Sequence, residues 1–141
     1  MKVLVVGAGF AGVWAAAGAA RQREQAGLTP DDLQVILAAP GPNLVIRPRL
    51  YEENPEGMCV PLSRILTPAD VTHVSCTVTR IDPRGHAAAA VTATGENIVM
   101  EYDRLVLASG SRLRRPTALP GHERLKAVDT LAEAIDLDAH L

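Results

Sequence analysis

The sequence predicts an α/β fold, in which a parallel sheet is assembled through a βαβ unit and an antiparallel β-meander is inserted beside it. Three observations support this prediction. The chain opens with an apolar strand, a glycine-spaced turn and an alanine-rich helix over residues 1–25. A second apolar stretch at Leu33–Ala38 follows at the spacing of a parallel crossover. Later, two short apolar runs flank a glycine-containing turn, and a further, strongly apolar strand follows them.

The opening strand and turn carry the most specific motif. Lys2–Gly7 reads KVLVVG, an aliphatic run typical of a strand covered on both faces. The next residues continue a Gly-x-Gly-x-x-Gly spacing formed by Gly7, Gly9 and Gly12. In a dinucleotide site these glycines allow a tight turn, close approach of the backbone to a pyrophosphate, and close helix packing, while the helix N-terminus attracts the phosphates. The alternative interpretation is a strand–turn–helix corner without a ligand.

The next elements complete the βαβ unit. A helix is predicted from Phe10 to about Gln25, where alanine is frequent, and Gly27 is expected to end it. Its last turn, with Arg21, Arg23 and Glu24, is expected to be solvated. Leu33–Ala38 (LQVILA) is the second strand, and the crossover should be right-handed.

A long connector and a meander are expected next. Asn43–Tyr51 is expected to be extended, and Pro61–Leu66 to form a short helix that starts at the proline. Val71–Ile81 is the third predicted strand. A hairpin is predicted to join Ala87–Thr94 to Ile98–Tyr102 through a Gly-Glu-Asn turn.

Arg104–Ala108 (RLVLA) is the last predicted strand. We expect it to return to the centre of the sheet after the meander. The Ser109-Gly110 turn would then lie at the carboxyl ends of the strands, where open α/β sheets bind ligands. Leu131–Leu137 has helical character near the end of the chain.

Composition limits the classes of function. The 141 residues suit one domain, and 48% hydrophobic with 21% charged residues indicate a globular chain. The formal net charge of −2 argues against nucleic acid as a partner. No apolar run reaches the ~20 residues of a membrane span. Cleavage of a signal peptide would remove the glycine motif, so a cytoplasmic location is expected.

The remaining chemistry-bearing residues form no recognisable catalytic or metal-binding group. Cys59 and Cys76 are the two cysteines, too far apart in sequence for a CxxC redox pair, and we expect buried thiols. The histidines, His73 among them, are scattered and are expected in loops or on the surface. No nucleophile, base and orienting group occur together, so neither a catalytic side chain nor a metal site is predicted.

Several stretches together, in order and spacing, resemble FAD-dependent pyridine nucleotide-disulfide oxidoreductases, and within them the type II NADH dehydrogenase-like proteins. These stretches are Met1–Trp14, Arg47–Glu52 (RPRLYE), Val78–Asp82 (VTRID), Tyr102–Ser111 (YDRLVLASGS) and Val128–Leu131 (VDTL). The resemblance implies a Rossmann-like FAD-binding fold. It also implies hydride transfer from NAD(P)H to FAD, followed by electron transfer to a quinone or another acceptor.

The resemblance also implies which residues bind the cofactor, which would be FAD rather than NAD at the first glycine motif. It assigns the FAD pyrophosphate to the backbones of Gly7, Ala8, Gly9, Phe10 and Ala11, with Gly12 behind them. It assigns the backbone of Val78 to the adenine and Ala108-Ser109-Gly110 to a turn beside the cofactor. It places Arg47 on the flavin side.

Two features depart from the family pattern. The second strand should end in Asp or Glu, which accept a hydrogen bond from a ribose hydroxyl, but Ala39 occupies that position. Neither Ala38 nor Pro40 can replace the acid. Loss of a bond to a charged acceptor costs about 1.5–3 kcal/mol, so FAD binding should be weaker, with backbone or water as other ribose partners. The chain also contains neither a second GxGxxG motif nor the family's later Gly-Asp motif.

We therefore predict that residues 1–141 are the FAD-binding domain of such a flavoprotein, an incomplete FAD/NAD(P)-binding domain that ends before the NAD(P)H domain and is inactive alone. NAD(P)H is expected as the co-substrate of the full-length family. The alternative is a stand-alone, non-catalytic nucleotide-binding module, or a subunit completed by a partner chain. Self-association into a homo-oligomer through an uncovered apolar surface is also left open, as is a peripheral position of the full-length protein on the inner face of a membrane.

Overall fold

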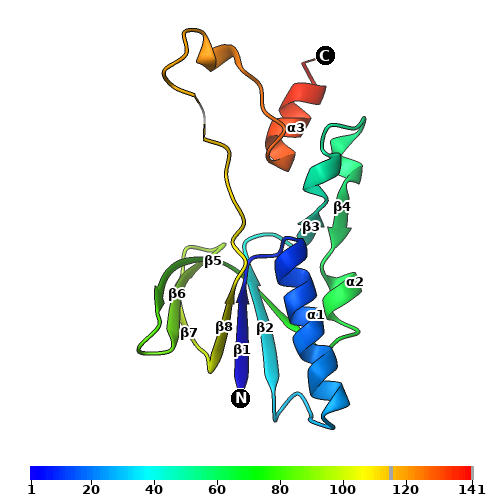
Figure 1. The fold of residues 1–141 in the computed structure, drawn as a ribbon, viewed down its shortest axis with the longest axis vertical. Coiled ribbons are helices and arrows are strands. Elements are labelled where there is room, and N and C mark those ends of the chain that lie inside the picture. Colours follow the sequence, from blue (N-terminus) through cyan, green and yellow to red (C-terminus); the bar gives the residue numbers. More distant parts are fainter. Residues whose placement is uncertain (115, 141) are drawn as a thin grey trace. The chain divides into compact units, whose positions relative to one another are not determined.

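The computed structural model describes residues 1–114 and 116–140, which divide into two compact units. Unit 1 comprises Met1–Leu44 and Pro61–Gly110, and unit 2 comprises Val45–Val60 and Ser111–Leu141. Unit 1 contains the main sheet and the first two α-helices (Figure 1).

Unit 1 is built on a mixed sheet. Its strands are β1 (Lys2–Val6), β2 (Gln34–Ala39), β5 (Thr72–Asp82), β6 (Ala87–Thr92), β7 (Asn97–Glu101) and β8 (Arg104–Leu107). They lie in the order β7-β6-β5-β2-β1-β8. β1 pairs in parallel with β2 and β8, and β2 pairs in parallel with β5. β5, β6 and β7 pair antiparallel, so the predicted parallel sheet with a meander is confirmed.

The first helix, α1 (Phe10–Gln25), joins β1 to β2 and lies along one face of the parallel strands (Figure 1). Its buried apolar side chains, Val13, Ala16 and Ala20, are small, and they let the helix approach the strands closely. Gly27 follows with φ +68°, and its N–H donates to the Glu24 carbonyl at 3.0 Å. The predicted bounds of this helix are confirmed.

Arg23, in the last turn of α1, is buried rather than solvated. Only 6% of the residue is exposed, and its guanidinium donates to three backbone carbonyls. The acceptors are the carbonyl oxygens of Leu33 at 3.2 Å, Asp70 at 3.2 Å and Ala69 at 3.0 Å. The expectation of a solvated helix end is therefore wrong at this residue, because Arg23 faces the start of β2 and the loop before β5.

β5 changes its partner along its length. Thr72–Ser75 pairs in parallel with the end of β2, and the residues from Cys76 onward pair antiparallel with β6. The register shifts between Val78 and Arg80, a β-bulge that increases local twist. The meander consequently curves away from the parallel strands (Figure 1).

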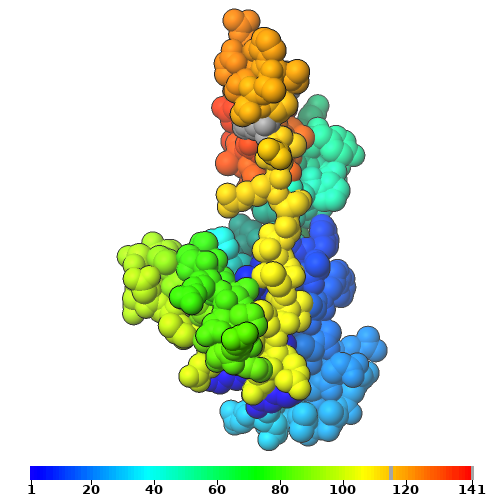
Figure 2. Space-filling model, turned by 60° about the vertical axis from the view of Figure 1, so that its left-hand side comes forward, coloured from blue at the N-terminus to red at the C-terminus, as the bar shows by residue number. Residues whose placement is uncertain are grey.

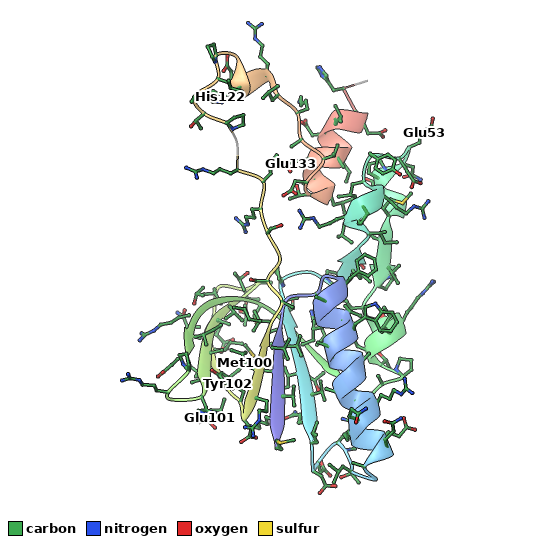
Figure 3. The ribbon with its side chains drawn as sticks, viewed as in Figure 1. Glu53, Met100, Glu101, Tyr102, His122 and Glu133 are labelled. Atoms are coloured by element: carbon green, nitrogen blue, oxygen red, sulfur yellow. The ribbon has the colours of Figure 1, made fainter. Side chains whose placement is uncertain are left out.

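The meander closes a hydrophobic core against the second face of the parallel strands. Its buried members are Leu4, Val6, Ala38, Cys76, Ala88, Ala90 and Tyr102. The Tyr102 hydroxyl donates to the Asp82 carbonyl at 3.3 Å, so the polar end of this buried ring is paired. Figure 3 labels Tyr102 beside Met100, a half-buried member of the same core.

β8 lies at the edge of the sheet, which corrects the expectation that it returns to the centre. β1 already has β2 on one side, so the returning strand occupies the other side, and among the described strands β8 pairs only with β1. Val106 and Leu107 are 36% and 61% exposed. Figure 2 shows this segment, in yellow, running along the surface. The Ala108 N–H nevertheless donates to Val6 at 2.8 Å, so the turn after β8 reaches the carboxyl ends of the strands.

The connector between β2 and β5 differs from its prediction in two places. Asn43–Tyr51 is extended only at its start, β3 (Asn43–Val45), because Pro48 favours the 3-10 helix η1 (Arg47–Arg49) that follows. The predicted Pro61–Leu66 helix is shorter. Pro61 ends β4 (Cys59–Pro61), which pairs with β3 in a separate two-stranded sheet, and α2 spans Ser63–Leu66.

Unit 2 contains short helical segments and one longer helix. Besides η1 it has η2 (Pro55–Gly57), η3 (His122–Arg124) and α3 (Leu131–Asp138). α3 opens with a capping box: the Thr130 hydroxyl accepts from the Glu133 N–H at 3.3 Å, and the Glu133 carboxylate accepts from the Thr130 N–H at 3.1 Å (Glu133 is labelled in Figure 3). The predicted helix is thus confirmed. No helix in the described ranges combines the length and apolar character needed to cross a membrane.

Candidate functional site

Gly7, Gly12 and Ala108 bring β1, α1 and the turn after β8 into direct contact. Gly7 has φ +106°, and its N–H donates to the Ala38 carbonyl at 2.9 Å. A Cβ added to Gly7 would lie 2.3 Å from the Ala108 carbonyl oxygen, and one added to Gly12 would lie 1.9 Å from the Gly7 oxygen. Both positions therefore exclude a side chain. They correspond to the tight-turn and close-packing glycines that the sequence predicts.

Gly9 differs from these two glycines. A Cβ there would meet no atom within 4 Å, and its φ of −73° is accessible to any L-residue. Neither crowding nor backbone strain within the protein requires glycine at this position. What the glycine leaves is exposed, accessible backbone at the entrance to α1.

The start of α1 suits an anion. Gly9 is the N-cap and provides no side-chain cap, and the first turn has no acidic residue. The first N–H groups of a helix lack intrahelical partners, and the helix dipole gives this end partial positive charge. Phe10 and Ala11 are exposed beside them. The arrangement can bind a phosphate through backbone groups alone.

The residues that end and follow β2 carry no carboxylate. Ala39 is 3% exposed, and Pro40–Pro42 carries no polar side chain. The polar groups come instead from β5: His73 Nε2 lies 3.2 Å from the Ala39 carbonyl oxygen, and the Ser75 hydroxyl donates to Pro40 at 3.1 Å. His73 is thus a half-buried strand residue, not a loop or surface histidine. Ser75 could not be identified from the sequence, because only the register of β5 against β2 places it at this strand end.

The remaining predicted positions of unit 1 lie along the same sheet. Ala8 is half-buried within the glycine turn. Ser109 and Gly110 are exposed after Ala108, and Gly110 has φ +71°. Val78 is half-buried further along β5, where it pairs with Ala90 and packs on the meander core. The structure thus brings the glycine turn, Ala39 and the Ala108–Gly110 turn together at the carboxyl ends of the parallel strands.

Arg47 belongs to unit 2, where it makes an ion pair with Asp129. Its Nε donates to the Asp129 carbonyl oxygen at 3.0 Å, its Nη1 to the Ser111 carbonyl oxygen at 3.3 Å, and its Nη2 to the Asp129 carboxylate. The same carboxylate accepts the Leu113 N–H at 3.0 Å. Arg47 therefore holds two segments of unit 2 together. Its place on the flavin side stays a prediction.

The Asp129 carboxylate should order its neighbours in a pH-dependent way. The Leu113 N–H, and then Arg47, hold the pKa of Asp129 below its ordinary value. Because the folded-state pKa is lowered, the stabilisation is complete above the unfolded pKa of about 4 and is lost as pH falls through the lower folded value. We expect Asp129→Asn to accelerate hydrogen exchange of the Leu113 amide at pH 7. In wild type, the hydrogen bond from the Leu113 N–H to Asp129 should open more often as the pH falls, and this pH dependence should be absent from Asp129→Asn.

A matched control is Asp136→Asn, which removes a carboxylate paired with Lys126 at 2.6 Å on another part of unit 2. Exchange at Leu113 should be unchanged in this variant. Equal Leu113 protection in wild type and Asp129→Asn at pH 7 would contradict the assignment.

The cysteines are free thiols in the structure. Cys76 is buried in the meander core, where burial raises the pKa of its thiol, and Cys59 is half-buried. The prediction of a buried thiol is confirmed for Cys76 and holds only in part for Cys59. Within residues 1–114 and 116–140, no cluster of three or more His, Cys, Asp or Glu side chains could hold a metal ion.

A cavity of about 530 Å³ lies beside the second half of α1, away from the glycine turn. Arg21, Arg23 and Leu28 contribute to its walls, together with Ile65 and Asp70. The guanidinium of Arg23 is already bonded to backbone carbonyls. Arg23 therefore serves to hold neighbouring segments of the fold together, and the candidate site remains the glycine turn.

Comparison with known proteins gives a consistent result. The family described as pyridine nucleotide-disulphide oxidoreductase matches residues 1–141. NADH dehydrogenase-like proteins from two strains of Mycobacterium tuberculosis, CDC 1551 / Oshkosh and H37Rv, are each 42% identical over 141 residues. The match covers 99% of this chain and 34% of each relative, so the chain spans about a third of the length of these curated relatives.

Solved structures share the fold. The sulfide:quinone oxidoreductase of Aquifex aeolicus is 26% identical with a TM-score of 0.72, over 99% of this chain and 31% of that protein. The water-forming NADH oxidase of Lactobacillus brevis, bound to NADH, is 23% identical with a TM-score of 0.78, over 99% of this chain and 32% of that protein.

Proposed function

Since the chain belongs to the pyridine nucleotide-disulphide oxidoreductase family, we propose that it is the FAD-binding part of an NADH dehydrogenase-like flavoprotein. Its glycine turn would hold the cofactor. In the complete protein, bound FAD would accept a hydride from NAD(P)H and pass electrons to a quinone or another acceptor. A quinone is named for the Aquifex aeolicus relative, which makes quinones the first acceptors to test.

The observation that carries the proposal is the contrast among the three glycines. Gly7 and Gly12 are needed by the fold, because a Cβ at either would collide with backbone at 2.3 and 1.9 Å. Gly9 is not needed by the fold, since a Cβ there meets nothing within 4 Å. A ligand that approaches the backbone of Gly9 explains why the motif has glycine there too, and a pyrophosphate at the start of α1 is such a ligand.

The residues present fit the diphosphate part of FAD. The backbones of Gly7 to Ala11 would bind the pyrophosphate, and the backbone of Val78 would face the adenine. Ala108-Ser109-Gly110 would lie beside the cofactor. No side chain is required to transfer a proton in this part, because the protein mainly positions such a cofactor and adjusts its electronic properties.

A non-catalytic nucleotide-binding module, or a subunit completed by a partner chain, is the second candidate. Ala39 favours it, because the carboxylate that would anchor the ribose is missing. The exposed apolar side chains of β8, Val106 and Leu107, also fit a chain that is completed by further structure, including a second copy of itself.

Titration of the 141-residue protein with FAD tests the proposal. We expect saturable quenching of flavin fluorescence by wild type. Gly9→Ala should bind at least about tenfold more weakly, equivalent to ~1.4 kcal/mol, because its methyl group lies where the backbone approaches the ligand. Gly18→Ala is the control, since Gly18 is an exposed residue of α1 with nothing within 4 Å of an added Cβ. Failure of wild type to bind FAD would overturn the proposed cofactor site.

A further inference from the structure

We propose that the Ser75 hydroxyl takes the place of the missing strand-end carboxylate and binds a ribose hydroxyl of the dinucleotide. The inference rests on the proposed function, because it assigns one more residue to the same site. It concerns the adenosine end of the ligand, which β5 would hold next to the pyrophosphate at the glycine turn.

The register of the sheet places Ser75 beside the position of the expected acid. Ala39, at that position, is the parallel partner of Ser75 in the β2–β5 ladder. On the other side of β2, the end of β1 continues into Gly7-Ala8-Gly9, which has no polar side chain. Pro40–Pro42 also has none. Two strands, β1 and β5, flank β2. At the level of the end of β2, the polar side chain on these strands is that of Ser75 in β5.

The geometry leaves Ser75 able to accept a hydrogen bond. Its hydroxyl donates to the Pro40 carbonyl oxygen at 3.1 Å, which uses its single hydrogen and points the oxygen toward the chain that leaves β2. A hydroxyl has two acceptor lone pairs in addition to its donor, so the oxygen of this exposed residue can still accept from a ribose hydroxyl. A carboxylate would accept in the same way, with greater strength.

His73 has a different role, although it lies on the same strand. Its Nε2 is 3.2 Å from the Ala39 carbonyl oxygen and its side chain is half-buried, so it bonds to the strand end from within unit 1. His73 therefore holds the carbonyl of Ala39, and Ser75 holds the carbonyl of Pro40. Of the two side chains, that of Ser75 is exposed and that of His73 is half-buried.

Competition against FAD tests the inference. ADP, 2′-deoxy-ADP and 3′-deoxy-ADP would be titrated into the 141-residue protein loaded with FAD, using wild type, Ser75→Ala and the control Ser63→Ala. Ser63 is an exposed serine of α2, outside the site. We expect wild type and Ser63→Ala to bind ADP about three- to tenfold more tightly than one of the two deoxy analogues, the fold-change of one neutral hydrogen bond.

Ser75→Ala should lose that discrimination between ADP and the deoxy analogue. The ratio is taken within each variant, so a change in stability caused by the lost bond to Pro40 cancels. Discrimination that persists in Ser75→Ala, or that is absent from wild type while FAD still binds, would overturn the role of Ser75 and leave the proposed function standing. Absence of FAD binding in wild type would overturn both.

Discussion

Gly12→Ala is expected to destabilise unit 1 by about 3 kcal/mol or more, at or above the usual upper end for an overpacked core. The added Cβ would lie 1.9 Å from the Gly7 carbonyl oxygen and 2.9 Å from its carbonyl carbon. Both atoms are backbone, and the N–H of the same Gly7 is bonded to Ala38 at 2.9 Å. The clash can be relieved only by moving α1 away from β1 or by disturbing the turn between them. Urea unfolding followed by circular dichroism measures the loss.

Two other glycines give matched controls for this substitution. Gly18→Ala lies on the same helix at an exposed position with open space, so it should stabilise the protein by up to about 1 kcal/mol through helix propensity. Gly9→Ala should leave the unfolding midpoint close to that of wild type, because its Cβ meets no atom. If Gly12→Ala unfolded at the same urea concentration as Gly9→Ala, the close contact between α1 and β1 would be wrong.

Arg23→Met is expected to destabilise unit 1 by about 3 kcal/mol, the cost of leaving buried acceptors without their charged donor. Methionine keeps most of the aliphatic stem but cannot donate to the carbonyls of Leu33, Ala69 and Asp70. These carbonyls belong to the start of β2 and the loop before β5, so the variant should loosen the attachment of both segments to α1. Chemical unfolding and amide exchange over the two segments measure the effect.

Arg21→Met is the control, because Arg21 is exposed two residues earlier on the same helix. It should change stability by less than about 0.5 kcal/mol, as usual for a surface substitution. Arg23→Lys should recover only part of the loss, since an ammonium cannot reproduce the planar fork of a guanidinium. Equal stability of Arg23→Met and Arg21→Met would show that the three carbonyl contacts contribute nothing.

Much of the fold follows from local sequence pattern. The bounds of α1 were predictable because the signals that set them are local. Alanine favours the helix itself, the glycine turn precedes the helix, and Gly27 follows its end. The hairpin of β6 and β7 was predictable for the same reason, since a short turn separates two apolar runs. The connector was less predictable, because the nine residues of Asn43–Tyr51 change from extended backbone to a 3-10 helix within one short segment.

The residues of the candidate site likewise include some that local sequence pattern predicts and some that it does not. Gly7, Gly9 and Gly12 were identifiable from their spacing between an apolar strand and an alanine-rich helix, and the structure separates their roles by what an added Cβ would meet. Ser75 was not identifiable, because it stands far from the motif in sequence and meets Ala39 only through the pairing of β5 with β2. Arg23 was expected to be solvated for a similar reason, because two of its three acceptors, the carbonyls of Ala69 and Asp70, are 46 and 47 residues away along the chain.

The α/β class, the βαβ order and the glycine turn follow from local sequence pattern, because strand period, helix propensity and glycine spacing act over a few residues. Four features follow from long-range contacts instead: the edge position of β8 beside β1, the burial of Arg23, the ion pair of Arg47 with Asp129, and the pairing of Ser75 with Ala39. Each of these depends on which distant segments lie side by side. That arrangement is set by the burial of apolar surface over the whole sheet and by the pairing of buried polar groups, neither of which a local pattern contains.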